Sequence, residues 1–352
     1  MSAFSFSFSG DDIEDTKVID SEPEPILRSH AAETGTLQRA TSSAFPIAGQ
    51  PLLQPQVHDL AAMLGALPSK IVYSTLVIKL DDGSQISIPR RELWDVRVQL
   101  MAEEDDEGLG NLGKDDVKTG VYEGGFKSWE SSVDVVKVLH KKTEGAGFSG
   151  KFLELGCGTA LPSLAVFQWL LESSNSAGSL DLGLADYNPT VLQLVTLPNI
   201  LLSWAQVTRK DSWEAEGELD LDENIIKDFL ASLVSHCIRL SFFSGAWSPA
   251  FDELVKGNMN SSTSCLTIIG AETIYSPAAL KSFAETLTDL LRSMPDNERM
   301  ALVAAKKVYF GVGGSMEDFC EMVRLQGGSV EQIREESDGV RRAVVEVKMP
   351  SE

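Results

Sequence analysis

The chain has 352 residues, of which 52 are acidic and 30 are basic, so its formal net charge at pH 7 is −22. This excess of negative charge argues against a phosphate-rich partner such as DNA or RNA, because binding to such a partner depends on Lys and Arg. Hydrophobic residues make up 43% of the chain, which is enough for a sizeable core. We therefore expect one full domain with an extension, and no direct nucleic-acid binding.

Cysteine usage and the N-terminus indicate the cellular compartment. The four cysteines stand far apart and form no C-x-x-C pair, which predicts neither a zinc site nor a disulfide framework. The N-terminus has no positive region followed by an unbroken apolar run, and no stretch of about 18 apolar residues occurs. The four histidines lack the spacing of metal ligands. These features predict an intracellular protein with no metal site and no membrane segment.

The first part of the chain is poor in large apolar side chains. Residues 1–55 mix Ser, Thr, Pro, Glu and Asp, a composition that predicts a largely disordered acidic tail. Within this tail Phe4, Phe6 and Phe8 alternate with serines. This pattern fits either a strand-like docking peptide or a plain tail with three aromatic residues.

Residues 56–116 form a predicted N-terminal extension with regular structure. Two β-branched runs within 70–88 flank an Asp-Gly pair at 82–83, the short-range signal of a β-hairpin. Segment 89–107 predicts a helix that ends in an acid run at 103–107. The apolar residues expected on one face of this helix are Leu93, Val96 and Leu100.

From about residue 120, short apolar strands alternate with longer helical segments, a pattern typical of a parallel sheet with crossover helices. The expected strands are 151–155, 181–186, 239–243, 265–270, 299–305, 329–333 and 341–348. Seven strands predict one doubly wound α/β domain over 117–352. In such sheets ligands bind at the carboxyl ends of the strands, near the point where the strand order reverses.

The first of these strands ends in a glycine loop with the sequence ELGCG at 154–158. Gly156 and Gly158 permit a close backbone approach to a ligand. A dinucleotide site has a third glycine where this chain has Leu161, and Glu154 places a carboxylate where a phosphate site excludes negative charge. The loop therefore predicts a neutral or cationic ligand.

The second strand ends at Asp186, 30 residues after Gly156. A carboxylate at this place accepts hydrogen bonds from the two hydroxyls of a ribose. A ligand with a ribose, no phosphate and a positive centre describes S-adenosylmethionine. The alternative is a plain strand-to-helix turn, in which Asp186 is only a helix N-cap.

Six stretches of the chain are similar to the protein-histidine N-methyltransferase family, which belongs to the seven-β-strand protein methyltransferases. They are GVYEGGFKSWESSVDVV (120–136), LELGCGTALPSLAVF (153–167), DYNPTVLQLVTLPN (186–199), FFSGAWSP (242–249), AETIYSP (271–277) and KKVYFGVGGSMEDF (306–319). The resemblance spans residues 117–349 and implies a Rossmann-like sheet with S-adenosylmethionine as methyl donor. It further implies a basic protein substrate, namely one histidine of large-subunit ribosomal protein three. We also expect a monomer in the cytoplasm and nucleus.

The same resemblance implies where individual residues lie relative to the cofactor. The residues expected along the cofactor or around its ribose and adenine are Trp129, Glu130, Ser131, Gly156, Asp186, Tyr187, Asn188, Gly245 and Trp247. The chain departs from the family at two cofactor-binding positions. Ala246 replaces a common acidic residue, and Ala271 replaces a common Ser. We expect these contacts to be weaker or to pass to the backbone.

The stretch ETIY at 272–275 ends the fourth strand, where related lysine methyltransferases carry an acidic residue and an aromatic residue around the target. We expect Glu272 to orient or neutralise the incoming group and Tyr275 to shape the methyl-transfer channel. Alternatively, Glu272 caps the helix that begins near Pro277. The segment 309–314, with Tyr309, Phe310 and three glycines, predicts either a substrate lip or a plain flexible turn.

Three functions remain open from the sequence. A histidine target needs mainly orientation, because an imidazole with a pKa near 6.5 is mostly neutral at pH 7. A lysine methyltransferase of the same group is less well supported, since this chain has ETIY where such enzymes have D-x-x-Y. A non-catalytic binding module is hinted at only by Ala246 and Ala271. The intact Gly156, Gly158 and Asp186 favour an enzyme.

Overall fold

The computed structural model describes residues 52–102, 125–143, 149–173, 179–260, 265–294, 298–309 and 314–350. Several predicted features lie outside these ranges. They are the tail up to residue 51, the acid run at 103–107, and Phe310, Gly311 and Gly313 of the proposed lip.

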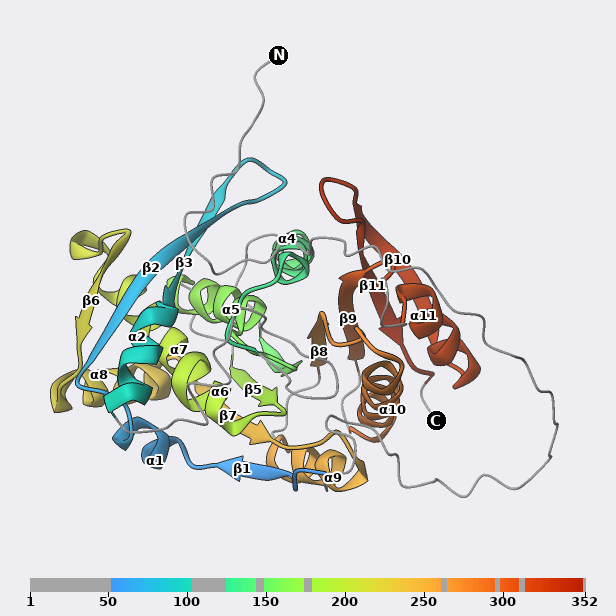
Figure 1. Cartoon of the computed structure of the whole chain (residues 1–352), viewed down its shortest axis with the longest axis horizontal. Helices are drawn as coiled ribbons and strands as arrows, with labels where there is room; N and C mark the ends of the chain where they lie inside the picture. Colours follow the sequence, from blue (N-terminus) through green and yellow to red (C-terminus); the bar gives the residue numbers. More distant parts are fainter. Residues whose placement is uncertain are drawn as a thin grey trace, which may run out of the picture.

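A central sheet of eight strands organises the molecule (Figure 1). From one edge to the other its strands are β1 (Gln56–His58), β7 (Ile238–Ser244), β5 (Leu180–Asp186), β4 (Gly150–Leu155), β8 (Cys265–Ala271), β9 (Glu298–Lys306), β11 (Arg342–Lys348) and β10 (Ser329–Glu336). Strands β7, β5, β4, β8 and β9 are parallel, whereas β1, β11 and β10 pair in antiparallel fashion. The strand order reverses between β4 and β8, so the expected ligand position is at their carboxyl ends.

All seven predicted strands are present, with ends within three residues of the predicted ones, and the α/β doubly wound fold is confirmed. The central strands β4 and β5 are buried along their whole length, as is usual for parallel strands with helices on both faces. Their side chains alternate between two cores. Leu182 and Leu184 point into one core, and Leu153 and Leu155 point into the other.

Helices cover both faces of the sheet (Figure 1). On one side lie α4 (Glu130–Thr143), α5 (Leu161–Glu172), α7 (Leu197–Thr208) and α8 (Glu223–Ser235). On the other lie α9 (Pro249–Asn258), α10 (Pro277–Ser293) and α11 (Met316–Leu325). The shorter helices are α1 (Leu60–Gly65), α2 (Leu93–Ala102), α6 (Pro189–Val191), the π-helical turn η1 (Leu192–Thr196) and the 3-10 turn η2 (Lys210–Ser212).

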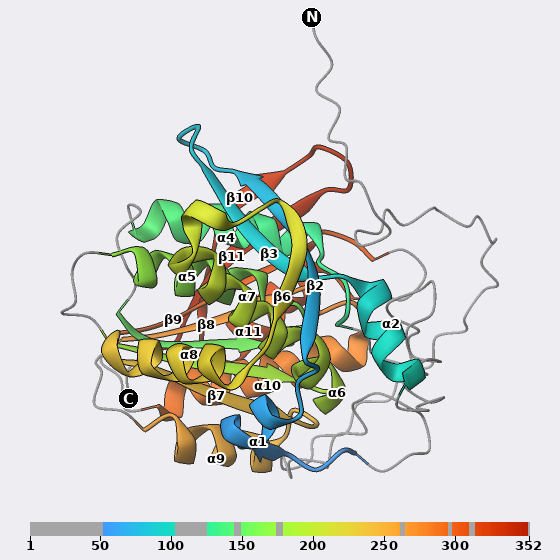
Figure 2. The ribbon, with the colours of Figure 1, turned by 90° about the vertical axis from the view of Figure 1, so that its left-hand side faces the viewer.

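The predicted hairpin is confirmed as β2 (Lys70–Lys79) and β3 (Gln85–Arg91), which pair in antiparallel fashion. Strand β3 continues through Arg91, so the first residues assigned to the following helix were wrongly predicted. Helix α2 nevertheless buries Leu93, Val96 and Leu100 as expected. A distant strand, β6 (Glu216–Asp220), joins the outer side of β2 and completes a three-stranded sheet (Figure 2).

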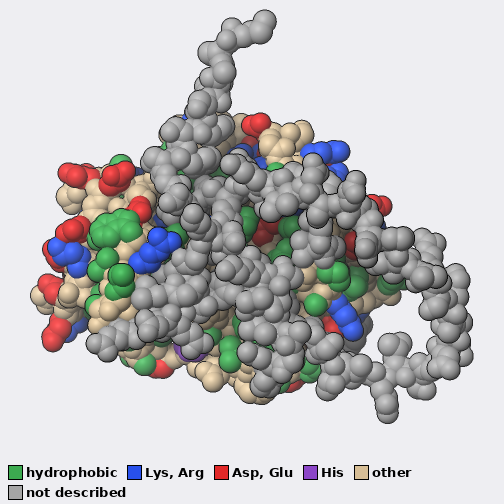
Figure 3. Space-filling model, viewed as in Figure 1, with side chains coloured by type: hydrophobic (Ala, Val, Ile, Leu, Met, Phe, Trp, Pro, Cys, Tyr) green, Lys and Arg blue, Asp and Glu red, His purple; other side chains and the backbone are tan. Residues whose placement is uncertain are grey.

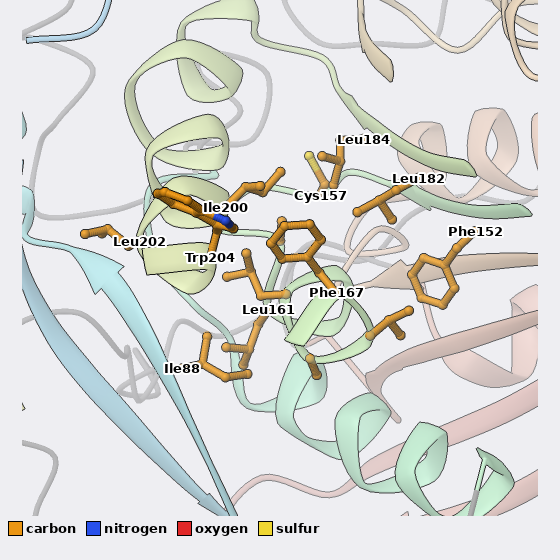
Figure 4. Packing of buried hydrophobic residues seen from close by; sticks show 14 of the residues in the cluster. Ile88, Phe152, Cys157, Leu161, Phe167, Leu182, Leu184, Ile200, Leu202 and Trp204 are labelled. Atoms are coloured by element: carbon orange, nitrogen blue, oxygen red, sulfur yellow. The ribbon is translucent and has the colours of Figure 1, made fainter. Parts of the chain in front are cut away.

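This second sheet shares a core with the central sheet and its helices. Ile88 of β3 has no exposed surface and belongs to the same packed group as Leu161 and Phe167 of α5 and Ile200 of α7 (Figure 4). Burying such a side chain contributes about 1.5–3 kcal/mol. The extension is therefore packed onto the larger sheet's helices through ordinary core contacts.

One helical run in the described ranges, Pro189–Thr208, is long and apolar enough to cross a membrane. It comprises α6, η1 and α7, and 78% of its apolar window is buried inside the protein. The apolar character of this run is thus accounted for by its place in the core.

The shared core predicts that the hairpin and the central sheet unfold together. Ile88→Ala should lower the free energy of unfolding by about 2–5 kcal/mol, because it leaves a cavity between the hairpin and α5. The matched control is Val77→Ala on the same hairpin, since Val77 is 50% exposed and should change stability little. Urea titration followed by both far-UV circular dichroism and tryptophan fluorescence measures this. A separate early transition in Ile88→Ala would contradict a shared core.

Candidate active site

The loop between β4 and α5 has a backbone that favours glycine. Gly156 and Gly158 have φ angles of 67° and 49°, in the left-handed region. A Cβ on Gly158 would lie 2.9 Å from the carbonyl oxygen of Gly125, and a Cβ on Gly156 would lie 2.9 Å from Cγ2 of Thr273. The loop is therefore closely packed between two other segments, and both glycines are required by space as well as by φ.

Asp186 joins the end of β5 to this loop. Its Oδ2 accepts a hydrogen bond from the Gly158 N–H at 2.9 Å, and its Oδ1 accepts one from the Asn188 N–H at 3.0 Å. Asn188 is the N-cap of α6, since its Oδ1 accepts from the Thr190 N–H. Asp186 is thus not the cap, and its carboxylate is fixed beside the glycine loop.

Glu154 lies beneath the loop and faces the first turn of α5. Its Oε2 accepts hydrogen bonds from both the N–H and the hydroxyl of Ser163. Burial raises the pKa of this carboxyl group to about 8, although the bonds from Ser163 act in the opposite direction. Glu154 therefore positions α5 relative to the loop, and a direct contact with a cofactor stays a prediction.

The residues expected near the adenine lie at the same end of the sheet. The Gly245 N–H donates to the carbonyl of Tyr187 at 3.2 Å. The Ala246 N–H donates to the carbonyl of Leu53 at 3.0 Å, so this amide is already engaged by the residues before β1. The Trp247 ring lies 3.6 Å from the position of a Cβ on Gly156. The structure thus groups Asp186, Tyr187, Gly245 and Trp247 around the glycine loop.

A second group of polar side chains surrounds Glu272 at the end of β8. Its Oε1 accepts a hydrogen bond from the Ser131 hydroxyl, and its Oε2 accepts one from the Tyr309 hydroxyl at 2.5 Å. Glu272 has a φ of 57°, which is unusual for a residue with a side chain and costs about 1 kcal/mol or more. Burial raises the pKa of Glu272, and it also raises that of Tyr309, which therefore remains a hydrogen-bond donor.

Charged groups on α4 and the C-terminal strands enclose this carboxylate. Arg342 donates to Asp134 and Glu130, each at 2.7 Å. The ammonium of Lys306 lies 5.0 Å from the centroid of the Trp129 ring. Trp129, Glu130 and Ser131 were expected along the cofactor. The structure places all three beside the group around Glu272, and their contact with a cofactor stays a prediction.

Thr273 connects the two groups, because it follows Glu272 in the chain and packs against Gly156. Glu272 is therefore the sequence neighbour of the residue that contacts the glycine loop. Glu272 is not a helix cap, since Ser276 caps α10 by accepting from the Ala279 N–H. Tyr275 is half-buried, and its part in a methyl-transfer channel stays a prediction.

Sequence reasoning missed several partners of Glu272. Tyr309 was expected only as part of a lip, and Lys306 and Arg342 were not singled out. The sequence did indicate that Tyr309 is part of the site, because Tyr309 lies in the stretch 306–319 that resembles the family. Its bond to Glu272 spans 37 residues, and no local pattern predicts such a pair.

The two groups fit S-adenosylmethionine. The loop offers backbone groups and packs closely, while the buried carboxylate of Asp186 disfavours a polyphosphate. Asp186 has the chemistry to accept from ribose hydroxyls, and Trp247 supplies an aromatic surface beside Gly156. Glu272 has the charge to stabilise a cationic sulfonium, and its role towards the cofactor stays a prediction.

Comparisons with known proteins identify the class. No protein-family model matches the chain. The chain is 33% identical over 343 residues to Histidine protein methyltransferase 1 of Saccharomyces cerevisiae, with 90% of this chain and 89% of that protein covered. It is 34% identical over 306 residues to Histidine protein methyltransferase 1 of Schizosaccharomyces pombe, with 84% and 85% covered.

A solved structure of a putative class I S-adenosylmethionine-dependent methyltransferase from Listeria monocytogenes matches with 13% identity and a TM-score of 0.36. It covers 74% of this chain and 71% of that one. The curated relatives define the class: this is a methyltransferase whose methyl donor is S-adenosylmethionine. The chain belongs to the histidine protein methyltransferase family.

The close packing of the loop predicts that a single methyl group weakens cofactor binding. Gly158→Ala would push a Cβ against the carbonyl of Gly125 and force a left-handed alanine, so we expect affinity for S-adenosylmethionine to fall roughly tenfold or more. Gly257→Ala is the matched control, because a Cβ there meets nothing within 4 Å. Isothermal titration calorimetry on both folded variants measures the affinity. Equal affinity in Gly158→Ala and wild type would contradict the assignment of the loop.

The raised pKa of Glu154 predicts a pH-dependent stability. Between its usual value of 4.5 and about 8, the unfolded chain releases a proton that the folded chain retains. This group's contribution to stability is therefore fully present below pH 4.5 and is lost as the pH rises to about 8, by at most about 1.4 kcal/mol per pH unit. Glu154→Gln should remove this loss, so its stability relative to wild type should increase from pH 5 to pH 8. Urea titrations at both values test this, and a difference independent of pH would contradict it.

Proposed function

We propose that the protein transfers a methyl group from S-adenosylmethionine to a ring nitrogen of one histidine in large-subunit ribosomal protein three. The observation that carries the reaction is the carboxylate of Glu272, held by Ser131 and Tyr309 next to the glycine loop. Membership of a family whose curated members are named histidine protein methyltransferases supports the histidine target.

A fixed carboxylate suits a neutral imidazole. The ring has one nitrogen with a lone pair and one that carries a hydrogen. A carboxylate that accepts a hydrogen bond from the N–H turns the lone pair of the other nitrogen away from itself and towards the donor. Because Ser131 and Tyr309 hold both oxygens of Glu272, the direction of that bond is set before the substrate arrives.

The reaction is an in-line displacement, for which bound S-adenosylmethionine supplies the electrophilic methyl group. The lone pair of the imidazole nitrogen forms the new N–C bond, and the electrons of the broken S–C bond remain on sulfur. The ring becomes a cation and then releases the proton of its other nitrogen. Glu272 stabilises that cation and is placed to accept the proton, with Lys306 and Arg342 nearby to stabilise its own negative charge before the ring arrives.

The charge of the protein supports a basic protein substrate. The net charge is −22, and Glu216, Glu218 and Asp220 of β6 are all exposed, with Lys70 paired to the last two. Acidic side chains gather on the edge of the molecule where β6 lies (Figure 3). Negative surfaces of this kind attract a basic protein and speed its encounter with the enzyme. Ribosomal proteins are basic because they bind RNA.

The pH dependence of the rate tests the target and the role of Glu272. With a histidine target, kcat/KM should rise with a midpoint near pH 6.5 and then level off, because protonated imidazole has no lone pair. The raised pKa of Glu272 acts in the same direction, since its ionised form is lost as the pH falls. A lysine target would keep gaining rate far into the alkaline range.

Glu272→Gln keeps the shape of the side chain and removes its charge. We expect it to lower kcat by a factor on the order of 100 with the fold intact. Glu223→Gln on α8 is the matched control, because that side chain is exposed and its ion pair is with Lys227 of the same helix. The measurement is a methylation assay on a peptide containing the candidate histidine. A Glu272→Gln variant as fast as wild type across the pH range would contradict the role given to Glu272.

A further inference from the structure

Two buried side chains of the helical run 192–208 hold the carbonyl groups of the cofactor loop. The Thr196 hydroxyl donates to the carbonyl of Gly158 at 2.6 Å, and the Asn199 amide donates to the carbonyl of Thr159 at 3.1 Å. Neither Thr196 nor Asn199 has exposed surface. Three residues apart, they lie on one face of the helix. We call this pair the loop bracket.

The loop bracket completes the fixation of Gly158. The peptide group before Gly158 is held by Asp186 through the Gly158 N–H, and the peptide group after it is held by Thr196 through the Gly158 carbonyl. Glycine has wide conformational freedom, so these bonds restrict rotations that its backbone alone would permit. The peptide group before Gly158 is also held by the Ala160 N–H, which donates to the Cys157 carbonyl at 2.6 Å. With both held, the loop has its ligand-binding shape before the ligand arrives.

The far side of the loop bracket is attached to the N-terminal hairpin. The Arg91 N–H donates to Oδ1 of Asn199 at 2.8 Å, so both ends of this amide are used. The Arg91 guanidinium donates to the carbonyl of Leu194 within η1 at 3.0 Å, and it is anchored on α2 by Asp95 at 2.7 Å. A continuous set of buried bonds therefore runs from the hairpin through Asn199 to the glycine loop.

We propose that Thr196 and Asn199 are positioning residues for S-adenosylmethionine, and that Arg91 makes the N-terminal hairpin part of the cofactor site. The proposal rests on the assignment of the glycine loop to this cofactor. It gives the stretch VTLPN at 195–199 a specific task and gives the extension a role in the reaction. None of the three residues needs to touch the cofactor.

The first test removes the hydroxyl of Thr196 without changing its shape. Thr196→Val leaves the Gly158 carbonyl buried without this donor, so S-adenosylmethionine should bind about tenfold more weakly. Thr196→Ser retains the hydroxyl and should bind within about threefold of wild type. Thr208→Val is the matched control, since among the described residues the Thr208 hydroxyl donates to carbonyls of its own helix, those of Trp204 at 2.9 Å and Ala205 at 3.4 Å. Calorimetry on samples shown to be folded by circular dichroism gives the affinities.

Steady-state kinetics separates positioning from general damage. In Thr196→Val, the KM for S-adenosylmethionine should rise in step with the dissociation constant, while kcat at saturating cofactor stays within about twofold of wild type. A structural defect alone would lower the melting temperature and leave the KM of the folded fraction unchanged. That second pattern would overturn the proposal.

Asn199 and Arg91 extend the test along the set of bonds. Asn199→Asp keeps the acceptor for the Arg91 N–H and loses the donor to Thr159, so it too should weaken cofactor binding about tenfold. This variant decides the question if Thr196→Val does not fold. Arg91→Met removes the guanidinium bond to the Leu194 carbonyl and keeps the backbone bond to Asn199. It should weaken binding several-fold although it lies on the hairpin, and an unchanged affinity would overturn the role given to the Arg91 side chain.

Cofactor binding by the wild-type protein distinguishes failure of this proposal from failure of the proposed function. If the wild type binds S-adenosylmethionine and the Thr196 and Asn199 variants bind it equally well, the loop bracket is overturned while the function stands. If the wild type does not bind, the cofactor assignment and the loop bracket fall together.

Discussion

The hydrogen bond from the Gly158 N–H to the carboxylate of Asp186 is the contact on which the rest of the site depends. It joins the carboxyl ends of β4 and β5, and it fixes a loop whose backbone strongly favours glycine. Gly125 packs directly over this loop, and Trp247 packs beside it. The parallel sheet brings the ends of β4 and β5 together, and this hydrogen bond fixes the conformation of the loop relative to Asp186.

The two halves of the site come from the two sides of the point where the strand order reverses. The glycine loop and Asp186 follow β4 and β5, whereas Glu272 follows β8. Thr273 bridges them through its contact with Gly156. A methyl donor held by the first half and an acceptor oriented by the second would therefore meet over the middle of the sheet. The doubly wound fold thus sets the geometry, and side chains from α4 and β9 refine it.

The sequence predicted most of the central sheet because short apolar strands alternate with longer helical segments, a pattern that can be recognised locally. It did not predict β1, whose three residues are too short to show a pattern. It also missed β6, whose acidic sequence has little strand propensity and is held by pairing with the distant β2 and by the ion pair of Lys70 with Glu218. Both β1 and β6 form because they pair with strands that are distant in the sequence.

The candidate site likewise contains residues that the sequence predicted and partners that it did not. Gly156, Gly158, Asp186 and Glu272 were predictable because each stands at a strand end, where such folds bind ligands. The partners that fix them were not, since bonds such as the one from Tyr309 to Glu272 depend on the path of the whole chain. Asn188 and Ser276, not Asp186 and Glu272, serve as helix caps. This difference removes the alternative in which either carboxylate is only a helix cap, and their roles towards cofactor and substrate stay predictions.

The most direct test of the central claim is the identity of the methylated residue. The purified protein is incubated with isotopically labelled S-adenosylmethionine and a lysate from cells that lack this activity, and mass spectrometry locates the labelled methyl group. The account predicts a label on one histidine ring of large-subunit ribosomal protein three. A label on lysine, or no label in any protein while the enzyme is folded and binds its cofactor, would contradict it.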